Sequence, residues 1–196
     1  MFFALWPEQA WSVRLLEAAA PAIAAVGGRA GGGSGGGSGG RALASVDLHV
    51  TLCFLGAVGE PELARLLEHA AAIDAAAFEL EFGRLECWPE PRIMAATVVR
   101  VPPEGERLAA ALAGAAREAG LAPDLRAWRP HVTLLRGVAK SAPPAADAAA
   151  AGWPAVGLTL PVTRFYLAES QGLGPQMASA TQAPRYARLA SWPLRG

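Results

Sequence analysis

Two stretches of the chain alternate polar and apolar residues with the two-residue period of a half-buried β-strand. They are residues 47–55, DLHVTLCFL, and residues 131–137, HVTLLRG. In each stretch the histidine and threonine fall on one face, and the valine and leucine fall on the other. Further short runs predict strands over residues 2–6, 78–88, 92–101, 158–168 and 186–192. The segment Pro89-Glu90-Pro91 favours a hairpin or a corner between two of them.

Three other segments carry apolar side chains at helical spacing. They predict amphipathic helices over residues 8–26, 60–77 and 104–120, the first interrupted or shifted near Pro21. Residues 141–152 are small and rich in alanine, and predict either a loop or a weak helix. Because strands outnumber helices and several look joined as hairpins, we expect a single α+β domain over residues 1–196.

The composition limits the classes of protein and partner. The 17 basic residues balance 17 acidic ones, which argues against broad salt-driven binding of nucleic acid but allows a small cationic site. With 53% apolar residues the chain can bury a core, so wholesale disorder is excluded. No apolar run reaches the ~18 residues of a membrane span, and the first residues lack a signal peptide's basic region. The two cysteines make no disulfide framework, so we expect a reduced, cytoplasmic protein.

Residues 31–40, GGGSGGGSGG, differ from the rest of the chain. The same four residues, Gly-Gly-Arg-Ala, stand at 27–30 and again at 39–42. We therefore interpret residues 31–40 as a flexible Gly/Ser insertion in a surface loop, with a native repeat expansion as the alternative to an engineered linker.

The four residues His-Val-Thr-Leu occur twice, beginning at His49 and at His131. Two such strands meeting across a groove would offer two imidazoles and two hydroxyls to one ligand. Near neutral pH one imidazole can accept a proton from water while the other donates one to a leaving oxygen. The hydroxyls of Thr51 and Thr133 can donate hydrogen bonds to phosphate oxygens, and Arg136 can add a fixed positive charge. This combination favours phosphodiester cleavage.

Other polar residues have less specific interpretations. His69 lies in a helical segment, where a solvent-facing role is expected. Cys53 follows Thr51 by two residues, so we expect it on the face of His49, as a small residue at the floor of the site rather than a nucleophile. No His or Cys cluster has the spacing of a metal site, so no metal is expected.

The residues HVTLCFLG at 49–56 and PHVTLLRG at 130–137 resemble the paired HxT motifs of the two-histidine phosphoesterase superfamily. The similarity is to bacterial RNA 2′,3′-cyclic phosphodiesterases, also called 2′-5′ RNA ligases. FFALWP at 2–7, CWPEPRIMAATV at 87–98 and FYLAES at 165–170 resemble flanking segments of that family in the same order. The resemblance covers nearly the whole chain.

The resemblance implies a bilobal α+β fold: two antiparallel-sheet lobes related by a pseudo-twofold axis, helices outside and an active-site groove between them. It implies cofactor-free, metal-independent hydrolysis of RNA or nucleoside 2′,3′-cyclic phosphate to a 2′-phosphate. We also expect a monomer. His49 would donate the proton to the leaving 3′ oxygen and His131 would activate water, although the sequence gives no orientation that fixes this order. Thr51, Thr133 and Arg136 would bind the phosphate.

Three aromatic residues, Phe54, Trp88 and Tyr166, are candidates for stacking a base, although the core is the commoner place for such side chains. Relatives often carry an arginine after the serine of FYLAES, where this chain has Gln171. Two other functions are compatible with the motifs: another activity of the superfamily, such as cleavage of 2′-5′ linkages or of another small cyclic phosphodiester, and a module that binds a nucleotide or RNA end without turnover. The sequence has no phosphate loop for ATP, and Lys140 is its one lysine, so ATP-dependent ligation is not expected.

Overall fold

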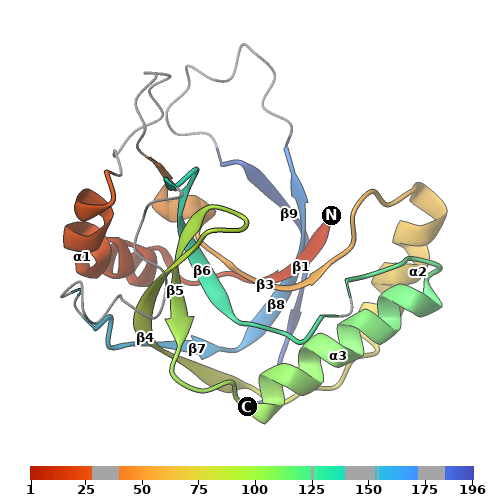
Figure 1. The fold of residues 1–196 in the computed structure, drawn as a ribbon. Helices are drawn as coiled ribbons and strands as arrows, with labels where there is room; N and C mark the ends of the chain where they lie inside the picture. Colours follow the sequence, from red (N-terminus) through yellow and green to blue (C-terminus); the bar gives the residue numbers. More distant parts are fainter. Residues whose placement is uncertain (28–39, 125, 140–152, 154, 172–183) are drawn as a thin grey trace.

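The computed structural model describes residues 1–27, 40–124, 126–139, 153, 155–171 and 184–196 (Figure 1). Within this part of the chain an antiparallel sheet is flanked by three α-helices, which confirms the α+β class. The helices are α1 (Gln9–Ala25), α2 (Glu60–Ala71) and α3 (Pro103–Glu118), with a 3-10 turn, η1, at Ser45–Asp47. The strands are β1 (Phe2–Leu5), β2 (Arg41–Ala42), β3 (Val50–Phe54), β4 (Phe78–Trp88), β5 (Ile93–Val98), β6 (His131–Arg136), β7 (Leu158–Val162), β8 (Arg164–Ser170) and β9 (Tyr186–Pro193).

The two strands that carry the repeated motif are neighbours in the middle of the sheet. The strand order is β7-β4-β5-β6-β3-β1-β8-β9, and β2 pairs with β6. Each motif strand follows a strand and a helix in the chain: β1 and α1 precede β3, and β5 and α3 precede β6. In the described residues the two arrangements differ only in the short elements β2 and η1, which lie between α1 and β3. The sheet runs continuously through the contact of β3 with β6. The division into two lobes therefore stays a prediction.

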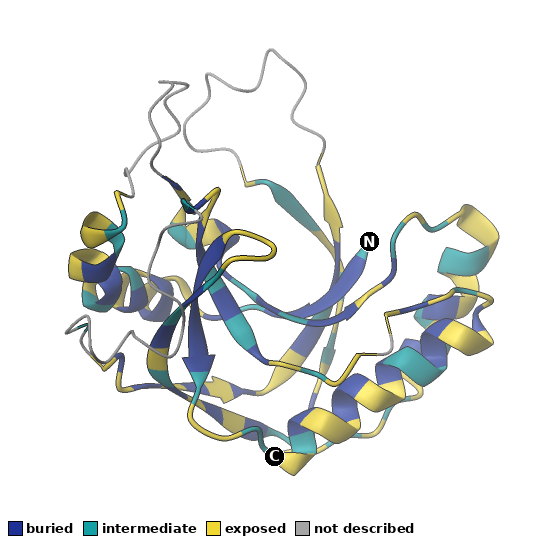
Figure 2. Cartoon of the chain, in the orientation of Figure 1, coloured by how far each residue is buried: buried dark blue, intermediate teal, exposed yellow. Residues whose placement is uncertain are grey.

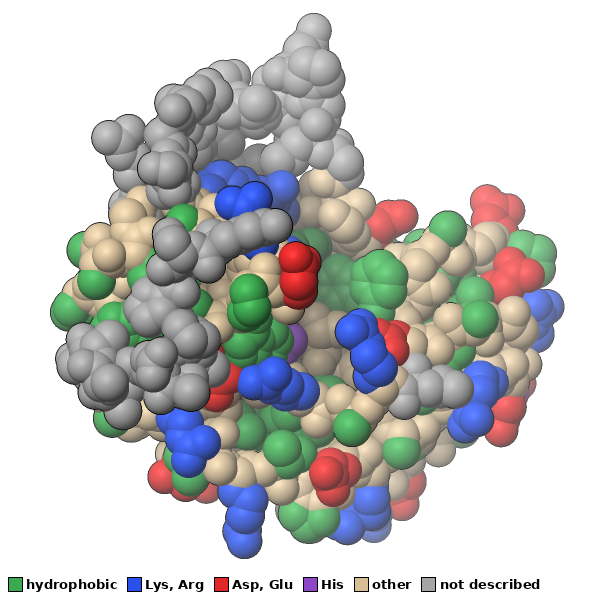
Figure 3. Space-filling model, viewed as in Figure 1, with side chains coloured by type: hydrophobic (Ala, Val, Ile, Leu, Met, Phe, Trp, Pro, Cys, Tyr) green, Lys and Arg blue, Asp and Glu red, His purple; other side chains and the backbone are tan. Residues whose placement is uncertain are grey.

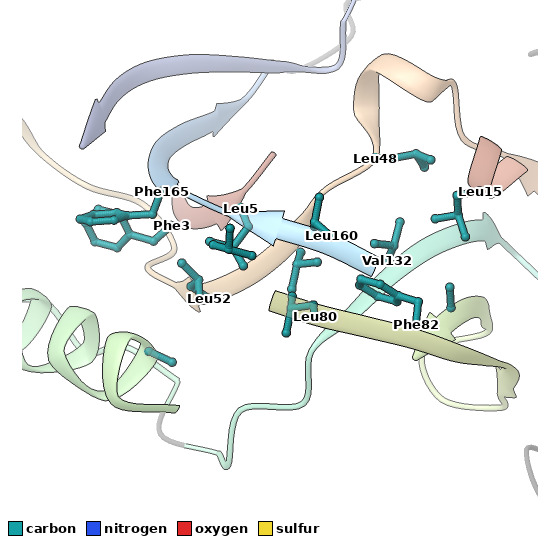
Figure 4. Packing of buried hydrophobic residues seen from close by; sticks show 14 of the residues in the cluster. Phe3, Leu5, Leu15, Leu48, Leu52, Leu80, Phe82, Val132, Leu160 and Phe165 are labelled. Carbon is teal, nitrogen blue, oxygen red and sulfur yellow. The ribbon is translucent and has the colours of Figure 1, made fainter. Parts of the chain in front are cut away.

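The hydrophobic core occupies one face of the sheet, between the strands and the helices. Alternate strand residues point into it, including Phe3, Leu80 and Phe82, which are fully buried (Figure 4). Helix α1 adds Leu15, and α2 and α3 add leucines to the same cluster. The burial colouring follows these faces, with buried residues along the inner side of each helix and exposed residues outside (Figure 2). The opposite face of the central strands carries a second, smaller apolar cluster around Phe2 beside polar side chains.

Helix α1 differs from its prediction. It continues through Pro21 without a break. A proline removes one backbone hydrogen bond, and the carbonyl that it leaves free needs another partner. Pro21 is exposed, so water can supply that partner. The helix is also fixed by its buried face, where Leu15, Ala19 and Ala22 pack into the core.

The second helix and the last long strand also differ from their predictions. Helix α2 ends at Ala71, and Ala77 instead donates its N–H to the carbonyl of Arg195. The predicted strand over 158–168 is two strands, because β7 pairs with β4 whereas β8 pairs with β1 near the other end of the sheet. The break falls at Thr163, whose carbonyl accepts the N–H of Leu194.

Some predictions concern residues outside the described part of the chain. These are the Gly/Ser insertion up to Gly39 and the segment 141–152. In the described residues the hairpin predicted around residues 89–91 is confirmed, since β4 and β5 pair antiparallel on either side of it. None of the described helices has both the length and the apolar composition that a membrane crossing requires.

Candidate active site

The two histidines lie diagonally across the contact between β3 and β6. The strands are antiparallel with Val50 opposite Val132. This register places His49 across from Thr133, and Thr51 across from His131, with all four on the face opposite the core. Diagonal neighbours in such a ladder are about 7–8 Å apart. The structure therefore brings both predicted histidines and both predicted threonines into one site.

A β-bulge in β3 changes which residues follow Thr51 on the site face. Thr51 lies opposite Ala4 of β1, but the preceding residue of β1, Phe3, lies opposite Cys53. Leu52 is therefore the extra residue of the bulge, and Leu52 and Cys53 both point into the core. The expectation that Cys53 shares the face of His49 is wrong for this reason.

The same bulge occurs at the matching position of β6. Thr133 lies opposite Ala95 of β5, and Leu135 lies opposite the preceding residue of β5, Met94. Leu134 is thus the extra residue, and Leu134 and Leu135 are both fully buried. Arg136 then returns to the face of the histidine and threonine and is exposed. Strict alternation would have placed Arg136, three residues after Thr133, on the core face.

His49 is held by the backbone and surrounded by aromatic rings. Its Nδ1 lies 2.7 Å from the carbonyl oxygen of Asp47. A carbonyl can only accept a hydrogen bond, so Nδ1 carries the proton and Nε2 of the neutral ring has the lone pair. Trp6 stacks on the ring with centroids 4.9 Å apart, and Phe2 and Tyr186 lie at 5.0 and 4.8 Å.

These surroundings determine the protonation of His49. Burial among the rings is the main cause that lowers the pKa of His49 to about 4, and the nearby charges of Arg136 and His131 lower the pKa further. The hydrogen bond to the carbonyl of Asp47 acts in the opposite direction. In the free protein His49 is therefore neutral near pH 7, with Nε2 available as a proton acceptor.

His131 has the same backbone contact but a charged neighbourhood. Its Nδ1 lies 2.8 Å from the carbonyl oxygen of Arg129, again two residues earlier. The ring of Trp88 lies 4.6 Å from the imidazole, and the Arg129 guanidinium lies 3.9 Å above that indole. Glu86 joins the group, since it accepts hydrogen bonds from Trp88, from Arg129 and from the hydroxyl of Thr97.

Burial is the main cause that lowers the pKa of His131, and Arg129 and Arg136 lower it further. The carboxylate of Glu86 raises that pKa, as does the hydrogen bond to the Arg129 carbonyl. His49 has no acidic side chain among the causes of its shift. The surroundings thus favour a proton on His131 over one on His49, the reverse of the order that the resemblance implies.

The three candidates for base stacking lie outside the main core. Phe54 is 58% exposed, because the bulge in β3 turns it to the site face opposite Phe2. Trp88 packs against His131, and half-buried Tyr166 lies opposite Ala4 and 6.3 Å from the ring of Trp6. The expectation that the core is their commoner place does not hold for them.

His69 and the second cysteine lie away from this site. His69 lies where α2 meets α3, at the surface as expected, with its side chain 35% exposed and its Nδ1 3.3 Å from a carboxylate oxygen of Glu118. Cys87 is buried, and burial raises the pKa of its thiol, as it raises that of Cys53 to about 11. Within the described ranges no three His, Cys, Asp or Glu residues are grouped so as to hold a metal ion.

Sequence reasoning missed Glu86, Asp47 and Trp128. Asp47 is buried, and its carboxylate accepts the backbone N–H of Arg185 at 2.8 Å beside the site. Trp128 donates its indole N–H to the carbonyl of Thr51 at 2.9 Å, and so supports β3 from outside. An acidic residue on an otherwise half-buried strand was the one available signal for Glu86. The contacts of Asp47 and Trp128 depend on distant segments and had no local signal.

The family model of the 2′-5′ RNA ligase superfamily matches residues 18–173, which include both histidine strands. The chain belongs to the 2′-5′ RNA ligase superfamily. An RNA 2′,3′-cyclic phosphodiesterase of Archaeoglobus fulgidus is 33% identical over 109 residues, which are 55% of this chain and 61% of that protein. One of Aeropyrum pernix is 31% identical over 100 residues, 46% of this chain and 53% of that protein. The chain thus spans about half to three fifths of the length of these curated superfamily relatives.

A solved structure extends the superfamily likeness to the whole fold. The crystal structure of E. coli LigT complexed with 3′-AMP superposes with a TM-score of 0.76 at 24% identity, and covers all of this chain and 97% of that chain. At this identity the likeness concerns the fold. The arrangement of helices and sheet described above is therefore that of LigT.

Proposed function

We propose that the protein hydrolyses 2′,3′-cyclic phosphates of RNA ends or nucleosides to 2′-phosphates. One observation carries the proposal: His49 and His131 lie diagonally on one sheet face, and each has Nδ1 bound to the carbonyl two residues earlier. Both rings therefore present Nε2 to the same space, as a proton acceptor and a proton donor acting on one phosphate must. Membership of the superfamily and the names of the two phosphodiesterase relatives support the same reaction.

The reaction needs two proton transfers. The neutral imidazole takes a proton from water on Nε2 as the water oxygen forms a bond to phosphorus. The bond from phosphorus to the 3′ oxygen breaks, and the imidazolium gives its Nε2 proton to that oxygen. The product carries a 2′-phosphate and a 3′-hydroxyl, and the two rings regain their starting states by exchanging protons with water.

We assign the base to His49 and the acid to His131 from their surroundings. His49, among aromatic rings, has its pKa lowered to about 4, so it is neutral near pH 7. Burial also lowers the pKa of His131, but Glu86 acts in the opposite direction and favours a proton on His131 relative to His49. When the pKa of the base is lower than that of the acid, the base is neutral and the acid is protonated at every pH between the two pKa values.

The remaining polar residues would hold the phosphate. Thr51 and Thr133 each lie across from one histidine, where their hydroxyls can donate to non-bridging oxygens. Arg136 reaches the same face because of the bulge at Leu134, and its charge is felt by both imidazoles. For stacking the base we propose Tyr166, which lies at the edge of the aromatic group around His49.

The decisive experiment measures turnover of a 2′,3′-cyclic nucleotide with EDTA present, and resolves 2′- from 3′-phosphate products. His49→Ala and His131→Ala should each lower kcat/KM by about 10²–10⁴-fold. His69→Ala, which removes the third histidine at the seam of α2 and α3, is the matched control and should retain turnover. Tight binding without product would favour a binding module, and full turnover by either site variant would contradict the two-histidine mechanism.

A further inference from the structure

Two arginines face each other directly at one end of the candidate site. Arg41 of β2 lies opposite Arg136 of β6 in an antiparallel pair, and both are exposed. Side chains directly opposite in such a pair lie on the same face, with Cβ atoms about 4.5–5.5 Å apart, and like charges there destabilise the sheet. In the described residues neither guanidinium forms an ion pair or a side-chain hydrogen bond. An anion between them would remove this repulsion.

The pair lies on the site face. Arg136 follows His131 and Thr133 on that face after the bulge, and its charge lowers the pKa of both histidines. The main chain before Arg41 is held close, since a Cβ on Gly40 would lie 3.2 Å from the carbonyl oxygen of Arg136. Figure 3 shows a histidine at the floor of a hollow in this view and basic side chains along the edge of the hollow.

We propose that Arg41 binds the internucleotide phosphate next to the terminal cyclic phosphate, so that the site prefers an RNA chain end to a free nucleotide. This inference rests on the function proposed above. Arg136 serves the cyclic phosphate, and Arg41 stands on the next strand, about 4.8 Å further across the sheet. A guanidinium presents forked donors that match phosphate oxygens. A cyclic mononucleotide has no second phosphate and gains nothing from Arg41.

The chain's balanced charge agrees with a site of this size. With 17 basic and 17 acidic residues the protein has no excess positive charge for long polyanions. A single additional arginine contacts one further phosphate, so the preference should appear with a dinucleotide and grow little with longer chains.

The experiment compares a 2′,3′-cyclic mononucleotide with a trinucleotide that ends in the cyclic phosphate. In Arg41→Gln the ratio of kcat/KM for the trinucleotide to that for the mononucleotide should fall about tenfold, as expected for one charge-assisted hydrogen bond. The salt dependence of the trinucleotide reaction should weaken by about 0.7 in log–log slope, the share of one phosphate contact on a single strand. Arg14→Gln, on the exposed side of α1, removes the same charge elsewhere and should keep the wild-type ratio.

A wild-type ratio in Arg41→Gln would overturn the inference, and so would an equal fall in Arg14→Gln. If the wild-type protein turned over neither substrate, the proposed function would fail while the inference stayed open to a binding test. Equilibrium binding of a trinucleotide and a mononucleotide that each end in a 2′-phosphate then decides it, since Arg41→Gln should weaken the trinucleotide alone.

Discussion

Val50 of β3 lies directly opposite Val132 of β6, and this pair sets the geometry of the candidate site. Because the strands are antiparallel, identical HVTL sequences on either side of the pair place each histidine across from the other motif's threonine. The motifs are therefore equivalent in backbone geometry, down to a bulge at the same leucine. Their surroundings differ, since aromatic rings enclose His49 while Glu86 and Arg129 lie beside His131.

Both imidazoles should exist as the Nδ1–H tautomer when neutral, because each Nδ1 faces a backbone carbonyl. Long-range ¹H–¹⁵N spectra of the free protein at pH 8 report the tautomer of each ring. His69, whose Nδ1 lies near a carboxylate instead, provides an internal comparison. A predominant Nε2–H tautomer at either site histidine would contradict the arrangement in which Nε2 serves the substrate.

Replacing Glu86 by glutamine tests which histidine is the acid. Loss of the carboxylate should lower the pKa of His131, since Glu86 raises it, while leaving the pKa of His49 near its wild-type value. If His131 is the acid, the alkaline limb of the pH profile of kcat/KM moves to lower pH. If it is the base, the acidic limb moves instead.

Glu79→Gln is the matched control for this variant. Glu79 is exposed at the far end of β4 from Glu86, so its replacement removes the same charge from the same strand. Its pH profile should match that of the wild type. A Glu86→Gln profile with neither limb displaced would show that Glu86 does not act through His131.

The stability of the protein should fall with acid in a way that depends on His49. Its pKa is about 4 in the folded chain against an ordinary 6.5, so between these values the unfolded chain binds a proton that the native state does not. The contribution of His49 to the free energy of unfolding is complete above pH 6.5. As the pH falls toward 4 this contribution is lost, up to roughly 3 kcal/mol. His131 acts in the same direction, whereas buried Asp47, with its raised pKa, acts in the opposite one.

Urea unfolding of the wild type and of His49→Asn between pH 7 and pH 4 measures this contribution. The free energy of unfolding of the wild type should decline more steeply with acid than that of the variant. Parallel curves would mean that His49 titrates alike in the folded and unfolded chains.

Two glycines of α3 should respond oppositely to alanine. A Cβ on Gly105 would lie 2.4 Å from the ring of Trp128, so Gly105→Ala should destabilise the protein by about 1–3 kcal/mol. A Cβ on Gly114 meets nothing within 4 Å, so Gly114→Ala should stabilise by about 0.5–1 kcal/mol through its helix propensity. Urea midpoints at constant m-value measure both changes. A Gly105→Ala chain as stable as the wild type would show that Trp128 can move aside.

The element types were largely predictable because apolar periodicity is a local property of the sequence. The alternation around His49 and His131 correctly indicates strands with the histidine and threonine on one face. Strict alternation fails beyond the bulges, so the positions of Cys53, Phe54 and Arg136 could not be read from it. A bulge is fixed by how a strand pairs with its neighbour, and β1 and β5 are distant in sequence.

The segment 158–168 illustrates the same limit on a larger scale. Only two adjacent polar residues, Thr163 and Arg164, interrupt its apolar pattern, and Val162 and Phe165 on either side of them face the core. Only the pairing partners, β4 for one half and β1 for the other, divide it into two strands. Pairing partners are long-range information. For the same reason the contacts of Glu86 with Arg129 and of Asp47 with Arg185 were not foreseen.

The enclosure of His49 has a consequence for the order of folding. Its rings come from segments far apart in the sequence: Phe2 and Trp6 lie in or beside β1, and Tyr186 begins β9. Contacts between residues so distant in sequence form late, because the intervening loop must close first. During synthesis His49 would stay hydrated, with an ordinary pKa, until β9 has emerged and paired with β8. If His49 is the base proposed above, it can reach its low pKa only after β9 has paired with β8.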